Sequence, residues 1–273
     1  MKENDIKTAA FDKPTDSFMG LTLSEINQYL PAVRKSEDIF SDIDKLDDGL
    51  FLTDALEGLL RLPDKSVDLI IAEPPSEPVR NKIVSGETMT LNEYYQWNEN
   101  WLTESRRVLK STGAIYLFCD WKKSGMYHSL LNQSFYVQSR ITWQNQVGHD
   151  KTYAKGWKNV LSDIWFATKS EEFLFNGQVI NAEADNDNSR EETINFWSDI
   201  FEKGKADKIN DETPSEVLTR IFDVSSFKLS WVVDPFTRYG LAGVVAKNMG
   251  RRFIGFEVDQ DRLLIAMKRI DKT

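Results

Sequence analysis

Two short stretches of the chain combine residue types that could do chemistry. Residues 73–76 read EPPS and follow the apolar run VDLIIA, whereas residues 234–240 read DPFTRYG and follow WVV. Two consecutive prolines continue neither a sheet nor a helix, so the first strand must stop at Glu73. Because ligands of open α/β sheets bind beyond the carboxyl ends of the strands, we expect both stretches to be binding loops.

The second stretch belongs to a unit whose pattern is typical of a cofactor site. WVVDPFTRYGLAGVVAKNMGRRFIGFEVDQDRL predicts a strand, a loop, a helix and a second strand that ends in an acid. In this geometry the loop approaches an adenosine-type cofactor closely, and Glu257 can accept hydrogen bonds from the ribose hydroxyls. The alternative is an ordinary βαβ unit that binds no ligand.

The elements that must position these loops alternate between strand and helix. Two helix starts carry the capping-box pattern, Thr22 with Glu25 and Thr90 with Glu93. Near-continuous apolar runs such as VDLIIA and AIYLFC indicate strands that are covered on both faces. The alternation predicts an α/β fold, a doubly wound and mostly parallel Rossmann-like sheet with a small irregular insert. The expected strands are 50–53, 67–72, 113–120, 135–145, 163–170, 172–176, 231–236 and 251–259, and the expected helices are 22–30, 89–110, 125–134, 213–226, 241–250 and 260–270. A short helix is also expected between the first two strands, and residues 36–49 are expected to form an acidic helix or a linker.

The composition shifts define the domain organisation. Residues 1–48 are polar and acidic and are expected to form an N-terminal extension, and residues 49–273 form a single α/β domain. Within that domain residues 145–212 break the rhythm, because a basic and aromatic segment is followed by the acidic run NAEADNDNSREE. We expect this part to be an insert.

The bulk numbers exclude several classes of protein. The chain has 273 residues, a net charge of −9 and a sequence pI near 5.0, which argues against indiscriminate binding to phosphate. The single cysteine, Cys119, excludes an intrachain disulfide, and with His128 and His149 the only histidines we expect no metal site. The N-terminus lacks an apolar signal region, and no run approaches about 18 apolar residues. We therefore expect an intracellular, soluble protein without a membrane partner, in the cytoplasm or the nucleus.

In this order the two units resemble the β-class DNA amino-methyltransferases, which modify adenine N6 or cytosine N4. That family has a DPPY-type motif early in the chain, and later DPF, a glycine-rich turn with two threonines and a strand like GRRFIGIE. Here the corresponding stretches are TDALEGLLRLPDKSVDLIIAEPP, VVDPF and GRRFIGFEVD, and the resemblance covers roughly residues 50–271. It implies an S-adenosylmethionine-dependent methyltransferase fold, a flipped-out base as substrate, and target recognition by residues 145–212.

The resemblance also assigns a set of cofactor-binding positions. Several of them match the family's framework, and Gly255 matches as well. The candidate cofactor-binding residues are Asp54, Ala55, Asp234, Phe236, Arg238, Gly240, Glu257 and Asp259.

The candidate catalytic residues Glu73, Pro74, Pro75 and Ser76 depart from the family at two positions. In the family the acid and a proline carbonyl accept hydrogen bonds from the target amino group, and the aromatic residue stacks on the base. Glu73 is one methylene longer than aspartate, and misplacing an acceptor by about 1 Å can cost on the order of 10²-fold in rate. Ser76 cannot supply stacking that is worth roughly 1–3 kcal/mol per base.

The cofactor loop departs from the family in the same direction. Arg238 stands where the family has a loop glycine, and its side chain is expected to occupy or cover the methionine end of the pocket. Glycine serves at such positions by adopting positive φ or by letting the backbone approach closely, and arginine does neither cheaply. Leu241 and Ala242 replace the two threonines, and Thr213 replaces a lysine before the preceding helix.

Two segments could contact nucleic acid. KTYAKGWKN offers lysines for phosphates and aromatic rings for stacking, through Lys151, Tyr153, Lys155, Trp157 and Lys158. Arg80 and Lys82 follow EPPS. The alternatives are a solvated loop pinned by its aromatic residues and plain surface charge. Asp120 is either a site-lining acid or a helix cap, and Trp97 and Trp101 are expected to be core or interface anchors.

The changes at both loops lead to a main hypothesis and its alternatives. The main one is a catalytically impaired pseudoenzyme that binds DNA or RNA, or scaffolds an active methyltransferase, as a homodimer or a heterodimer. Non-catalytic partner subunits with EPP in place of DPP occur in adenine-methylating complexes of the wider superfamily, which is an analogy. The second is an active, divergent adenine-N6 or cytosine-N4 methyltransferase that uses S-adenosylmethionine, and the third is a DNA-binding regulatory module without a methylase partner. Under the first hypothesis the chain needs no cofactor.

Overall fold

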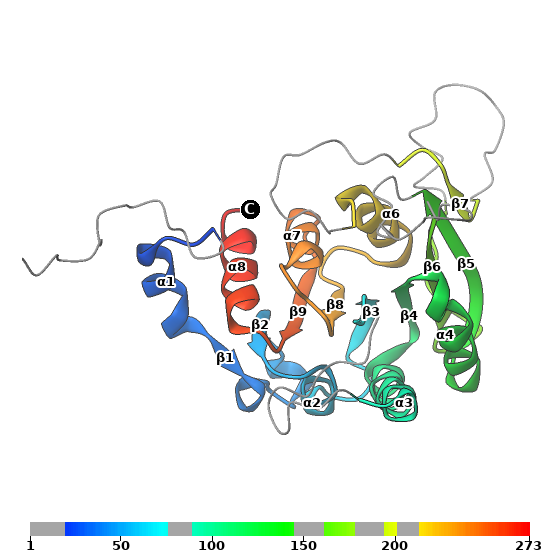
Figure 1. Cartoon of the computed structure of the whole chain (residues 1–273), viewed down its shortest axis with the longest axis horizontal. Helices are drawn as coiled ribbons and strands as arrows, with labels where there is room; N and C mark the ends of the chain where they lie inside the picture. Colours follow the sequence, from blue (N-terminus) through cyan, green and yellow to red (C-terminus); the bar gives the residue numbers. More distant parts are fainter. Residues whose placement is uncertain (1–19, 76–88, 145–160, 178–193, 201–212) are drawn as a thin grey trace, which may run out of the picture.

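The computed structural model describes residues 20–75, 89–144, 161–177, 194–200 and 213–273. Across these residues a sheet of nine strands runs in the order β1-β2-β9-β8-β3-β4-β6-β5-β7 (Figure 1). The strands are β1 (Arg34–Lys35), β2 (Gly49–Leu52), β3 (Val67–Ala72), β4 (Leu109–Cys119), β5 (Tyr136–Gln144), β6 (Leu161–Thr168), β7 (Phe196–Trp197), β8 (Trp231–Asp234) and β9 (Arg252–Glu257).

The sheet is parallel except at one strand. β6 runs antiparallel to both β4 and β5, and every other neighbouring pair is parallel. The predicted α/β fold with a mostly parallel, doubly wound sheet is therefore confirmed. Because β3, β8 and β9 are parallel neighbours, their carboxyl ends meet at one edge of the sheet, and this edge carries both predicted loops.

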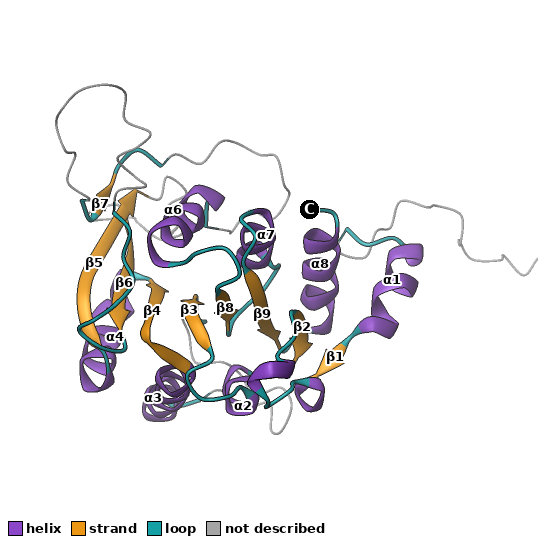
Figure 2. Ribbon diagram, turned by 180° about the vertical axis from the view of Figure 1, so that it is seen from behind, coloured by secondary structure: helices purple, strands orange, loops and turns teal. Residues whose placement is uncertain are grey.

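Helices cover both faces of the sheet (Figure 2). Helices α2, α3 and α4 pack on one face of the sheet, and helices α6, α7 and α8 pack on the other. Each set of three helices contributes to its own buried apolar cluster. The helices are α1 (Leu23–Tyr29), α2 (Ala55–Arg61), α3 (Leu91–Val108), α4 (Trp121–Ser134), α6 (Ser215–Ser225), α7 (Leu241–Asn248) and α8 (Gln260–Asp271).

Local sequence signals explain where these elements begin and end. Both predicted capping boxes are present, at Thr22 with Glu25 and at Thr90 with Glu93. Gly250 has φ of +70° directly after α7, as expected for a helix that ends at a glycine. In the run VDLIIA every residue except Asp68 is buried, because helices cover this central strand on both faces.

The described part of the N-terminal segment packs against the domain. β1 adds an edge strand beside β2, and α1 contributes to a small apolar cluster with α8. Tyr29 donates a hydrogen bond to Asp271 at 3.0 Å, and Glu25 forms ion pairs with Lys268 and Lys272, both at 2.8 Å. The boundary at residue 48 was drawn from composition and stays a prediction. The described segment before it contacts the sheet.

The structure differs from the expectations at several local points. β1 and β7 are short strands that were not expected, and β4 already begins at Leu109. Residues 172–176 form no strand, although Phe173 and Phe175 pack against Phe166 and the Leu174 N–H donates to the Thr112 carbonyl. The acidic stretch after β1 forms two short 3₁₀ turns, Ser36–Asp38 and Ile43–Lys45. Apolar alternation alone does not distinguish a strand from an extended segment that pins aromatic rings to a core.

Two negative findings apply to the described residues only. Within residues 20–75, 89–144, 161–177, 194–200 and 213–273, the helices are too short or too polar to cross a lipid bilayer. The same residues contain no cluster of three or more histidine, cysteine or acidic side chains that is arranged to hold a metal ion.

Candidate functional site

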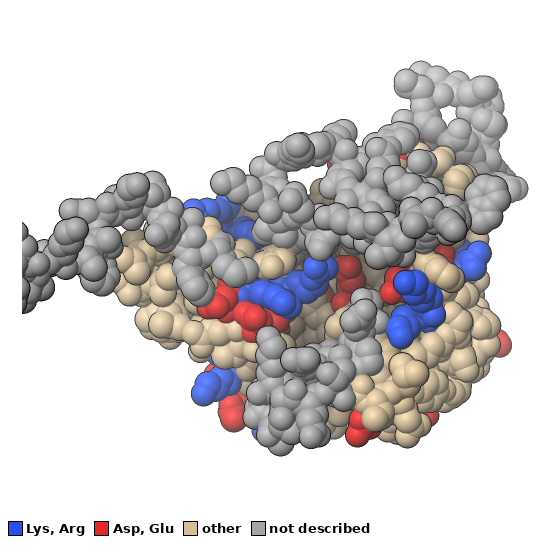
Figure 3. Space-filling view, in the orientation of Figure 1, with Lys and Arg blue, Asp and Glu red and all other residues tan. Residues whose placement is uncertain are grey.

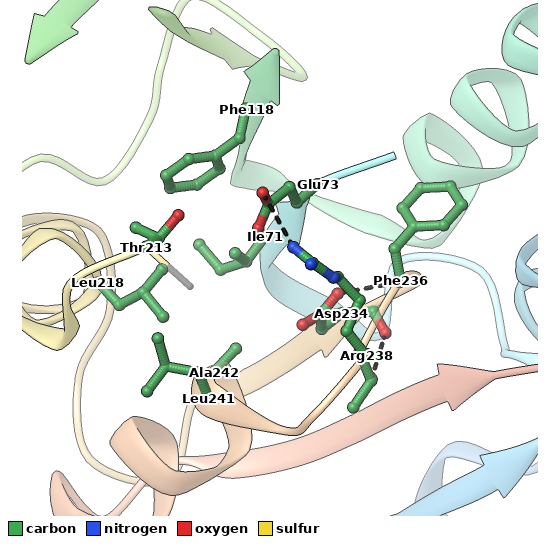
Figure 4. Close-up of a pocket in the computed structure, with 11 residues that line it drawn as sticks. Ile71, Glu73, Phe118, Thr213, Leu218, Asp234, Phe236, Arg238, Leu241 and Ala242 are labelled. Carbon is green, nitrogen blue, oxygen red and sulfur yellow. Dashed lines mark hydrogen bonds and ion pairs between the residues drawn. The ribbon is translucent and has the colours of Figure 1, made fainter. Parts of the chain in front are cut away.

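The two predicted loops meet where β3 and β8 end. The strands pair in register through Leu69 with Val232 and Ile70 with Val233, so Glu73 and Asp234 leave neighbouring strands at the same edge. A guanidinium nitrogen of Arg238 lies 3.4 Å from a carboxylate oxygen of Glu73 (Figure 4). The ion pair therefore links the EPP loop to the DPF loop across the space between the strand ends.

The backbone of the second loop is left-handed at two positions. Arg238 has φ of +50° and Gly240 has φ of +82°. A Cβ atom added to Gly240 would lie 2.8 Å from the Cβ of Ala266, so both conformation and space require glycine there. Arg238 is not a glycine, and an L-residue in this region costs roughly 1–2 kcal/mol. The loop thus keeps the turn of a glycine-rich loop while it carries an arginine side chain.

Glu257 holds the second loop through a hydrogen bond to its backbone. Its carboxylate accepts two backbone hydrogen bonds, from the Arg238 N–H and the Asp259 N–H, each at 2.9 Å. Burial raises the pKa of this carboxyl, and the N–H donors and the Arg262 charge oppose the rise. Asp259 in turn accepts hydrogen bonds from the Asp261 and Arg262 N–H groups and so caps α8. A carboxylate has about four acceptor sites, so these bonds do not saturate Glu257.

Asp234 is the most strongly perturbed acid of the site. It is 7% exposed, and burial raises the pKa of this carboxyl to about 8, helped by the charges of Glu73 and Glu257. The Phe236 N–H donates to Asp234 at 2.9 Å and partly offsets the rise. The strand end therefore holds a carboxyl that is largely protonated at neutral pH, and Arg238 pairs with Glu73 on its outer side.

The other framework residues have mainly structural contacts. The ring of Phe236 packs against Trp97 and Trp101 at 5.7 and 5.1 Å between centroids, which confirms the two tryptophans as core anchors. Asp54 accepts hydrogen bonds from the N–H groups of the first turn of α2, and Ala55 is buried beneath it. At Gly255 an added Cβ would lie 2.3 Å from the Thr237 hydroxyl, so only glycine fits.

A small cavity lies between the two loops and the helices α6 and α7. Its volume is about 40 Å³, and on this measure one water molecule needs about 10–15 Å³. Apolar side chains form much of the wall, including Leu241 and Ala242. The lining residues are Ile71, Glu73, Phe118, Thr213, Leu218, Asp234, Phe236, Thr237, Arg238, Leu241 and Ala242, most of them labelled in Figure 4.

Sequence reasoning missed a buried polar network that supports the EPP loop. Tyr94 donates a hydrogen bond to the Pro75 carbonyl at 2.6 Å and lies 3.0 Å from the Tyr127 hydroxyl. Asn98 accepts hydrogen bonds from Tyr127 and from the Trp101 indole, both at 3.0 Å. A signal was present, because Tyr94, Asn98 and Trp101 fall on one face of α3 and place an amide among large aromatic residues.

Of the remaining predicted residues, the structure describes some and leaves others outside the described ranges. Asp120 caps α4 by accepting hydrogen bonds from the Lys122 and Lys123 N–H groups, which is the capping role. Pro74 is buried and Pro75 is exposed. The remaining predicted residues lie outside the described residues, namely Ser76, Arg80, Lys82, Lys151, Tyr153, Lys155, Trp157 and Lys158.

Comparison with known proteins gives the same class as the fold and the two loops. The model of the N6/N4 DNA methylase family matches residues 67–268, which is most of the chain. The chain therefore belongs to this family of DNA methylases. Type II methyltransferase M.HpaI from Haemophilus parainfluenzae is 29% identical over 237 residues, covering 83% of this chain and 75% of the relative.

Solved structures share the fold at low sequence identity. The PvuII DNA methyltransferase, which is cytosine-N4-specific, superposes with a TM-score of 0.68 at 16% identity over 87% of this chain and 89% of its own. The M1.HpyAVI complex with SAM superposes with a TM-score of 0.62 at 18% identity over 81% and 98% of the two chains. These likenesses establish the fold of this chain as that of a DNA methyltransferase.

Proposed function

We propose that this chain is a DNA amino-methyltransferase homologue that has lost methyl transfer on its own, and that it binds nucleic acid or scaffolds an active methyltransferase. The observation that carries the proposal is the ion pair of Arg238 with Glu73. Through this pair the side chain expected to hold the target amino group is engaged by a side chain that replaces a glycine of the cofactor loop. One substitution thereby affects both halves of the reaction centre.

The residues present fit S-adenosylmethionine poorly. The cavity between the loops has room for a few water molecules, and Arg238 lines it with Leu241 and Ala242. These aliphatic side chains offer no hydroxyl that could accept a hydrogen bond from the ammonium or donate one to the carboxylate of a bound methionine. The guanidinium would also lie beside a sulfonium, so two positive charges would share one small space. We derive no methyl-transfer step for this chain.

A second function rests on the part of the site that is intact. Glu73, Pro74 and Pro75 end β3 at the edge where Asp234 and Gly240 end β8 and begin α7, and Tyr94 holds the Pro75 carbonyl. If Arg238 moved aside, the carboxylate of Glu73 and the Pro74 carbonyl could accept hydrogen bonds from an exocyclic amine. This arrangement supports an active, divergent adenine-N6 or cytosine-N4 methyltransferase.

Methyl incorporation separates the two functions. Purified protein is incubated with labelled S-adenosylmethionine and unmethylated genomic DNA, and Glu73→Ala serves as the matched inactive variant. The main proposal predicts the same background counts for both proteins. Incorporation by the wild type that disappears in Glu73→Ala would overturn it and establish the active enzyme.

The same assay tests the scaffolding role. An active methyltransferase that copurifies with this chain is assayed with and without it. An increase in incorporation that persists when the added chain carries Glu73→Ala supports a non-catalytic partner. An increase that is lost with Glu73→Ala contradicts it, because the chemistry would then depend on this chain.

A further inference from the structure

Beside the EPP loop lies a surface that the predicted nucleic-acid residues do not include. β4 ends at Cys119, and the first turn of α4 presents Trp121, Lys122 and Lys123, which we call the α4 patch. Trp121 is 54% exposed, which is unusual for the largest apolar side chain. The ammonium of Lys122 lies 5.9 Å from the Trp121 ring centroid, so charge and ring occupy the same surface.

The α4 patch contacts the site through Tyr94. The ammonium of Lys123 lies 5.4 Å from the centroid of the Tyr94 ring. The hydroxyl of the same tyrosine donates to the Pro75 carbonyl at 2.6 Å. One aromatic side chain therefore separates a lysine of the patch from the backbone of the EPP loop.

The first turn of α4 carries two lysines and no acid at the carboxyl edge of the sheet. Helices α2 and α8 begin at the same edge with acids in the first turn, Glu57 and Asp261, whereas α7, like α4, has none. Asp120, next to these lysines, caps α4 through its carboxylate. Basic side chains gather on two sides of a hollow in this face, with acidic side chains close to each group (Figure 3). The start of α4 therefore carries two cations, Lys122 and Lys123, and one anion, Asp120.

We propose that the α4 patch binds a DNA strand beside the EPP loop, with Lys122 and Lys123 on backbone phosphates and the Trp121 ring stacked on an unpaired base. The inference rests on the proposed nucleic-acid role and adds the surface that performs it. Lysine supplies the sequence-independent phosphate contacts, and an exposed indole supplies a π-face that suits any base. An exposed tryptophan also offers a stacking surface that the serine at position 76 does not.

The test is DNA binding by the full chain, followed by fluorescence anisotropy. The probe is a labelled 25-base-pair duplex with one central mismatch, titrated at several salt concentrations. In Lys122→Ala/Lys123→Ala the magnitude of the slope of log K against log salt should fall by roughly 1.4–1.8, because each of the two lost phosphate contacts removes about 0.7–0.9. At 0.1 M salt we expect affinity at least about tenfold weaker. The matched control is Lys45→Ala/Lys228→Ala, which removes the same charge from two exposed lysines on segments that lead into β2 and β8, at the opposite edge.

Two further variants test the stacking. Trp121→Ala should weaken binding to the mismatched duplex by about 5- to 150-fold, and Trp121→Phe should retain most of the affinity because it keeps an aromatic face. If the wild type binds DNA and the α4 variants bind it like the control, the α4 patch is wrong and the proposed nucleic-acid role stands. If the wild type binds no DNA at low salt, both are overturned. Thermal unfolding of each variant checks that the fold is retained.

Discussion

Arg238 combines a backbone conformation suited to glycine with a side chain that reaches the neighbouring strand end. Its φ of +50° lies in the left-handed region, and its guanidinium pairs with Glu73 at 3.4 Å. Both side chains are partly exposed, so the pair adds at most about 1 kcal/mol to stability. The left-handed backbone costs roughly 1–2 kcal/mol, so the two contributions of this residue to stability are of similar size and opposite sign.

The buried carboxyl of Asp234 gives a pH-dependent prediction. Its pKa is raised to about 8 in the folded protein from an ordinary value near 3.8, so the folded state binds the proton more tightly than the unfolded chain does. The free energy of unfolding should consequently fall as pH rises from about 4 to about 8. Asp234→Asn keeps an acceptor for the Phe236 N–H and removes the titration, so its stability should vary less over this range.

The measurement is the midpoint of thermal unfolding of both proteins from pH 5 to pH 9. The free energy of unfolding of Asp234→Asn, relative to that of the wild type, should increase as pH rises, by an amount on the order of a few kcal/mol at pH 8. Glu257, whose pKa is also raised by burial, remains in both proteins and serves as a common background. Parallel pH profiles for the two proteins would show that Asp234 is ionised over the whole range.

Among the elements, the loop from β8 to α7 is fixed by close packing against α8. Gly240→Ala places a Cβ 2.8 Å from the Cβ of Ala266 at a φ of +82°, and we expect it to lower the free energy of unfolding by about 2–4 kcal/mol. Gly125→Ala is the matched control, because Gly125 lies within α4 and a Cβ added there would have no neighbouring atom within 4 Å outside its own helix turn. It should raise stability by about 0.5–1 kcal/mol.

Urea unfolding of the two alanine variants checks this prediction. The sign of the effect should differ between them although the chemical change is the same. A Gly240→Ala variant as stable as the wild type would mean that α7 and α8 are less closely packed than in the structure.

The sequence predicted the elements well where a local cause determines them. Helix ends are set by the capping residues Thr22 and Thr90 and by the glycine after α7, through short-range hydrogen bonds and backbone conformation. Their effect can therefore be predicted from the local sequence. The site was less predictable, because the partner of Arg238 lies 165 residues away on another strand. The Tyr94 network was missed for the same reason, since the neighbours of α3 depend on how the helices pack.

For the whole molecule, the fold is shared with DNA methyltransferases, and the cavity between the two loops is small. The core, the sheet order and the helix layers are those of a DNA methyltransferase, and the family match spans residues 67–268. The residues between the two strand ends leave a cavity of about 40 Å³ bordered by an ion pair. We propose that a chain with this framework contacts DNA or a partner through its surface.

The most direct test of this account is calorimetric titration of the isolated chain with S-adenosylmethionine. The wild type should show no saturable heat up to millimolar cofactor, and Arg238→Gly/Leu241→Thr/Ala242→Thr should gain measurable binding because it restores the glycine and both hydroxyls. Arg238→Gly alone separates removal of the guanidinium from restoration of the polar groups. Micromolar binding by the wild type would contradict the claim that the two loops close the cofactor site.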